Sequence, residues 1–149
     1  LKYINVPKLV SVRTCFLPNN TTLEILSCPS LREIGDNFLR AKSDLKFLSL
    51  PKVYKIGDNF MKDNNSLIAI DLSSVVTIGN KFLYHNNTLE NLSLPNVLNI
   101  EDYFMFCNTS LKEIYIPNIK YYGTHFLNNN QGLYKKEEQV KRKILSKYE

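Results

Sequence analysis

The amino-acid sequence predicts a repeat solenoid, mainly β with short helical turns. Two observations predict it. Six copies of 22 residues follow one another without insertion or deletion, and they begin at Leu1, Leu23, Leu45, Leu67, Leu89 and Leu111. A fixed period in this range is typical of stacked repeats. Each copy also opens with a short strand-like pattern that leaves one apolar face, which a single copy cannot bury without its neighbours.

The copy that runs from Leu45 to Ser66 shows each predicted element in order. Its opening pattern L-x-x-L-x-L indicates a strand, and Pro51 ends the strand because proline has no N–H for a ladder. A second apolar pair, Val53 and Ile56, precedes Gly57. Glycine suits a turn with positive φ or a close approach of two backbones. Asp58 follows, a residue type that suits the cap of a short helical turn.

Two further positions are nearly constant. Phenylalanine occurs in all six copies, at Phe16, Phe38, Phe60, Phe82, Phe104 and Phe126, and Leu or Met follows each one. Two adjacent bulky apolar residues suit a turn or short helix that tips both inward. Four residues after each Phe stands an asparagine, with Lys42 as the exception, at Asn20, Asn64, Asn86, Asn108 and Asn130. We expect this internal asparagine to bond loop backbone groups that no ladder satisfies.

The run L-x-x-L-x-L-P-x-V-x-x-I-G-x-x-F-L-x-x-N-x-S resembles the BspA-like class of leucine-rich repeats, from Leu1 to about Gly132. Phe60 stands where that class usually has alanine, and Met61 where it has phenylalanine. The resemblance implies a leucine-rich-repeat right-handed coil of six repeats. It also implies a non-catalytic, protein-binding solenoid, often on a cell surface or secreted. It carries over no catalytic residues.

Two parts of the chain follow from this pattern. Residues 1–132 form the solenoid, and residues 133–149 are predicted to form a C-terminal amphipathic basic helix that serves as a cap or junction. Val140, Ile144 and Tyr148 would make its apolar stripe. Contact of this basic tail with an acidic partner or a membrane is the less favoured alternative. Because the sequence begins in register without Met, we expect a processed product or a fragment.

Charge and reactive residues exclude several functions. The chain has a formal net charge of +5, and six Lys or Arg against three Glu in residues 134–149 account for +3 of it. A solenoid near neutrality argues against nucleic acid as the ligand. His85, His125 and the three cysteines lie in different columns without metal-ligand spacing, and the Asp column is interpreted as turn caps. We therefore expect no enzyme, no cofactor and no metal site.

The outer face of the first strand carries the predicted binding site. Successive copies would place Tyr3, Ile25 and Phe47 about 4.8 Å apart in one apolar and aromatic patch, with Ser27 and Ser49 beside it. Exposed patches of this kind often mark partner sites. The alternative is that another segment or a self-contact covers the patch. A second column, on the second strand, is the weaker candidate and comprises Val10, Arg32, Tyr54, Val76, Leu98 and Lys120.

Two classes of function remain open from the sequence. The first is an interaction module of a surface adhesin or secreted effector, which binds a protein or a glycan through the strand face. The second is a structural spacer or docking segment of a larger protein whose activity lies outside this chain.

Overall fold

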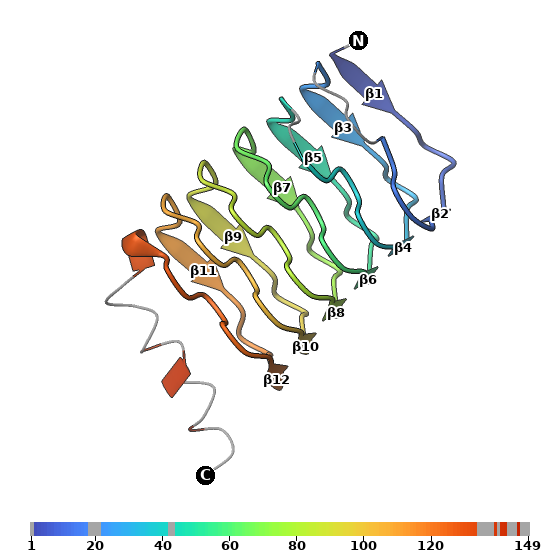
Figure 1. The fold of residues 1–149 in the computed structure, drawn as a ribbon. Helices are drawn as coiled ribbons and strands as arrows, with labels where there is room; N and C mark the ends of the chain where they lie inside the picture. Colours follow the sequence, from blue (N-terminus) through green and yellow to red (C-terminus); the bar gives the residue numbers. More distant parts are fainter. Residues whose placement is uncertain are drawn as a thin grey trace.

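The computed structural model describes residues 2–17, 22–41 and 44–133, together with 139, 141, 142 and 146. These residues form a parallel β-solenoid in which the coils stack along one axis (Figure 1). The first strands of the coils are β1 (Tyr3–Asn5), β3 (Ile25–Ser27), β5 (Phe47–Ser49), β7 (Ala69–Asp71), β9 (Asn91–Ser93) and β11 (Glu113–Tyr115). The second strands are β2 (Ser11–Val12), β4 (Glu33–Ile34), β6 (Lys55–Ile56), β8 (Thr77–Ile78), β10 (Asn99–Ile100) and β12 (Tyr121–Tyr122). The predicted repeat solenoid is confirmed.

All strand pairs are parallel, and each residue pairs with its counterpart 22 positions along the chain, as Ile25 does with Phe47. The six second strands form one continuous sheet in the order β12-β10-β8-β6-β4-β2. The first strands form a four-stranded sheet, β1-β3-β5-β7, and a separate pair, β9 and β11. The surface that the outward side chains of the first strands make is called the strand face below.

The core is built from the columns that the repeat keeps constant. The Phe rings stack along the axis with centroids 5.2–5.4 Å apart and nearly parallel planes, from Phe16 to Phe126. Phe60 is 0% exposed and lies between Phe38 and Phe82, as predicted. Burial of aromatic and aliphatic columns together supplies the main stabilising free energy of such a stack.

The turns around the Phe column are not helical. Asn59, Met61 and Asp63 have φ of 56°, 48° and 60°, and the equivalent residues of the other coils repeat this pattern. Residues with positive φ occur at every second position of the turn, and their N–H groups point alternately to the next and to the preceding coil. The Asn59 and Asp63 amides donate to the next coil, and the Met61 amide donates to the preceding one, each over 2.8 Å. These bonds between coils replace the bonds of a helix.

Within residues 2–17, 22–41 and 44–133 the turns contain no helix other than the 3-10 helix η1 (Gln131–Leu133), so the predicted short helical turns are wrong for these ranges. The predicted C-terminal helix falls mostly on residues outside the described ones. The boundary between a solenoid over 1–132 and a helix over 133–149 stays a prediction.

The glycine column serves close approach rather than positive φ, since none of the described glycines has positive φ. A Cβ at Gly79 would lie 2.5 Å from Asp58 Oδ1 and 2.7 Å from the Gly57 carbonyl carbon. That carboxylate accepts a hydrogen bond from the Asn80 amide at 2.7 Å. The acidic column thus links neighbouring coils, and its predicted role as a helix cap is wrong.

The asparagine column is buried at Asn64, Asn86, Asn108 and Asn130. Asn130 Nδ2 donates to the carbonyls of Met105 and Leu127 at 2.8 and 2.6 Å, and Asn108 Nδ2 donates to that of Leu83 at 2.9 Å. The Asn108 amide in turn donates to Asn130 Oδ1 at 3.1 Å. The predicted bonding of loop backbone is confirmed for these two residues. Asn20 and Lys42 lie outside the described residues.

Candidate functional site

The structure brings the sequence-predicted site residues together on the strand face. Tyr3 pairs with Ile25, and Ile25 pairs with Phe47, so the three side chains stand in register on neighbouring strands. Their exposed fractions are 54%, 39% and 44%. Large apolar side chains that share one exposed face form a contiguous patch of the kind that partners bury.

Small polar residues border this patch. Ser27 pairs with Ser49, and Ser49 pairs with Asp71, two positions further along each strand. A shallow hollow of about 310 Å³ lies between the two columns over β3, β5 and β7. Ile25, Ser27, Phe47 and Ser49 all line it. Aromatic and aliphatic groups beside small hydrogen-bonding groups resemble the composition of interface cores.

A line of ion pairs runs along the other side of the patch. Lys2 Nζ lies 2.9 Å from Glu24 Oε1, and Lys46 Nζ lies 3.3 Å from Glu24 Oε2. Hydrogen bonds from both ammonium groups lower the pKa of Glu24, and the bond to Glu24 raises the pKa of Lys2. These pairs are partly exposed and screened by salt, so they define the edge of the patch more than they stabilise the fold.

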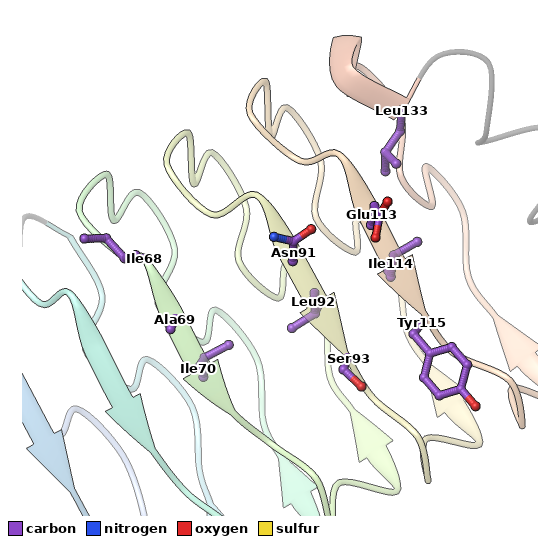
Figure 2. Close-up of a pocket in the computed structure, with 10 residues that line it drawn as sticks. All are labelled: Ile68, Ala69, Ile70, Asn91, Leu92, Ser93, Glu113, Ile114, Tyr115 and Leu133. Carbon is purple, nitrogen blue, oxygen red and sulfur yellow. The ribbon is translucent and has the colours of Figure 1, made fainter.

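A second, larger groove of about 600 Å³ lies over β7, β9 and β11 (Figure 2). Its apolar lining includes Ile68, Ile70 and Ile114, and its polar lining includes Asn91 and Glu113. The sequence did not predict a site in this region, because the outward column of the first strands changes from apolar to polar there. The groove depends on how neighbouring coils pair, and the residue types at one position of the repeat do not reveal that pairing.

The second-strand column is a poorer site. Val10 and Tyr54 are exposed, but Arg32 stands between them. The Tyr54 hydroxyl donates a hydrogen bond to Glu33, which raises the pKa of Tyr54. Arg32 thus separates Val10 from Tyr54, Val76 and Leu98, and of these three Val76 and Leu98 are only partly exposed.

An aromatic cluster on the turn side of the last coils was not predicted. Tyr84 stacks on Phe106 with ring centroids 5.2 Å apart, and Tyr103 stacks on His125 at 4.4 Å. Tyr103 and Phe106 meet edge to face at 5.6 Å. His85 lies 4.3 Å from Tyr84, so the two histidines, although in different columns, border one cluster. The rings pack on one another, which accounts for the cluster without a ligand.

The described residues offer little chemistry elsewhere. Among them, no group of three or more His, Cys, Asp or Glu side chains could hold a metal ion. The three cysteines are free, and burial raises the pKa of the Cys28 thiol to about 11, which makes it unreactive near neutral pH. Within the part of the chain that the structure describes, no helix has the length and apolar character needed to cross a membrane.

The class of protein follows from this geometry, since the chain is a parallel β-solenoid repeat protein with an apolar patch on its strand face. Its family is shown by comparison. The model of the BspA type leucine rich repeat region matches residues 12–134 with six copies, so the chain belongs to that family. Leucine-rich repeats generally mediate protein interaction and are generally non-catalytic. No curated protein and no solved structure matches the chain.

Proposed function

We propose that the protein is a non-catalytic interaction module that binds a partner protein through Tyr3, Ile25 and Phe47 on the strand face, with Ser27 and Ser49 as polar contacts. One observation carries this proposal, namely three large apolar side chains exposed in register on adjacent strands. Their outward direction serves no purpose in the core, which other columns fill. Aromatic and aliphatic anchors of this kind dominate binding free energies at interfaces.

In this proposal the protein is part of a surface adhesin or a secreted effector, and a protein is favoured over a glycan as the ligand. The patch lacks the dense hydrogen-bonding groups that a glycan requires, because its central column is apolar. The alternative, a spacer in a larger protein, predicts no loss of binding when the patch is altered. A signal peptide or cell-wall anchor in the full gene would favour the adhesin, and an appended enzyme domain would favour the spacer.

The test has two steps. A photo-crosslinking amino acid at Phe47 captures whatever contacts the patch in the source cells, and the same amino acid at Tyr121, exposed on the second strand, is the control. The protein captured only at Phe47 is then purified and titrated against wild type and an Ile25→Ser, Phe47→Ser variant. We expect the variant to keep its folding stability and to bind more weakly by about 2 kcal/mol or more.

Three results bear against the proposal. Undiminished binding by the folded variant would place the contact elsewhere. Equal capture at Phe47 and Tyr121 would show that the strand face is not selected. An unfolded variant would mean that these side chains stabilise the solenoid rather than a complex.

A further inference from the structure

The sheet under the strand face is divided at one step. Strands β1, β3, β5 and β7 pair in order, and β9 pairs with β11. Between β7 and β9, in contrast, the described residues form no ladder. At the paired steps one carbonyl accepts two amides of the next coil, as the Lys46 carbonyl accepts those of Ile68 and Ala69. No such bond to the Ile68 carbonyl occurs in the described structure. Among the described residues, the backbone groups on both sides of this step therefore lack the ladder bonds that the other steps have.

The division is confined to the strand face. On the opposite side β8 pairs with β10, and in the core Phe82 stacks on Phe104 at 5.3 Å. Beyond the strand end, Asn96 Nδ2 donates to the Ser73 carbonyl at 2.7 Å and closes the gap. The opening is a bounded feature of a solenoid that is otherwise continuous.

The sequence also changes at this step. The column beside the patch reads Lys2, Glu24, Lys46, Ile68, Glu90, Lys112, and its charged members pair along the axis. A Lys at position 68 would stand beside Lys46, and a Glu there would stand beside Glu90. Like charges directly opposite each other destabilise a sheet, so neither charge suits the position. Ile68 avoids both contacts but remains 55% exposed.

The groove over β7, β9 and β11 lies across this division and reaches the core. The inward residues of β3 and β5 are buried, whereas Ile70 and Ile114 remain partly exposed. Figure 2 shows Ile70, Leu92 and Ile114 in one row across the three strands. An aliphatic side chain placed here would cover apolar surface that the solenoid leaves accessible to water.

The charge of this region is opposite to that of the chain. The strand residues around the groove carry Asp71, Glu90 and Glu113 against Lys112, whereas those of the first three coils carry Lys2 and Lys46 against Glu24. The strand face is therefore net negative around the groove, although the chain as a whole is +5. Complementary charge would steer a basic segment to the groove and reject an acidic one.

We propose that this groove, distinct from the patch at Tyr3, Ile25 and Phe47, docks a short extended segment of a partner protein that carries an aliphatic side chain flanked by Lys or Arg. The aliphatic side chain lies over Ile70 and Ile114. The flanking basic side chains reach the carboxylates at the rim through their long apolar stems.

The probe is a short fluorescent peptide in which Lys and Leu alternate, titrated against the whole chain by anisotropy. A peptide with Glu in place of Lys tests the charge, and one with Ser in place of Leu tests the apolar contact. We expect the Lys–Leu peptide to bind about tenfold more tightly than either. Ile68→Ser and Glu113→Lys should each weaken it about fivefold or more, with Ile68 and Glu113 both at exposed positions where folding tolerates change.

Two control variants make the result decisive. Glu101→Lys makes the same charge change at an exposed residue outside the groove, and Ile25→Ser with Phe47→Ser alters only the other patch. Both should leave the affinity of the peptide unchanged. Equal binding of the three peptides overturns the proposal, and so does equal weakening by Glu101→Lys and Glu113→Lys. Loss of binding only in the Ile25→Ser, Phe47→Ser variant would assign the peptide to the patch of the proposed function instead.

Discussion

Truncation of Phe60 tests the Phe column most directly. The Phe60 ring is 0% exposed and stacks on two neighbours, at 5.4 Å from Phe38 and 5.2 Å from Phe82. Phe60→Ala therefore removes a whole ring from a site that the flanking rings prevent from collapsing. Truncation of a buried Phe typically costs about 3–5 kcal/mol, and the upper half of that range is expected here. The loss of two stacked contacts, each worth about 0.5–1.5 kcal/mol, is part of that cost.

The assay is a urea titration followed by circular dichroism and by tyrosine fluorescence, because the chain has no Trp. Two probes are needed since repeat arrays can unfold in parts. The matched control is Phe47→Ala, the same truncation at a Phe that is 44% exposed, which should cost less than about 1 kcal/mol. A cost below about 1 kcal/mol for Phe60→Ala, or equal costs for both, would refute the assignment of this column to the core.

Three further predictions concern groups between coils. Asn108→Ala should lower the free energy of unfolding by about 1–3 kcal/mol in the same titration, because the Leu83 carbonyl loses its donor; a cost no greater than that of Asn96→Ala would count against this. Gly79→Ala should cost about 1–3 kcal/mol, since its Cβ would meet Asp58 Oδ1, and an unchanged urea midpoint would contradict it. The raised pKa of Cys28, about 11 against an ordinary 9.0, means that the stability from its neutral thiol is complete below pH 9 and is lost as pH rises to 11. Urea midpoints that fall equally in wild type and Cys28→Ala over that range would exclude this thiol as a cause.

The sequence predicts the architecture because the period and the core columns are local and repeated. Ile25 is exposed where the alternation of the strand indicates, and Phe60 is buried where its constant column indicates. The path of the turns could not be predicted in the same way. The residue types around Phe60 suit a helical turn as well as the observed alternation of left-handed and right-handed residues, and only bonds to the neighbouring coils decide between them.

One part of the candidate site could be predicted from the sequence, and the other part could not. The patch at Tyr3, Ile25 and Phe47 is readable as one column. The groove over β7, β9 and β11 is not, because it depends on a missing ladder between two coils. A signal was present in the column that holds Ile68, where the alternation of charge changes phase between Lys46 and Glu90. Comparison of this position across the six copies therefore identifies the boundary between β7 and β9 from the sequence.

The repeat separates the columns that stabilise the fold from the column that faces solvent on the first strands. The Phe, Asn and Gly columns are nearly constant because each copy must fit against its neighbours. The outward column of the first strands holds six different residues, Tyr3, Ile25, Phe47, Ala69, Asn91 and Glu113, on a backbone that does not change. Because these side chains lie outside the core, packing does not require this column to be apolar at one end and polar at the other. The strand face therefore presents two surfaces of different chemistry to a partner. These are the apolar patch at Tyr3, Ile25 and Phe47 and the groove over β7, β9 and β11.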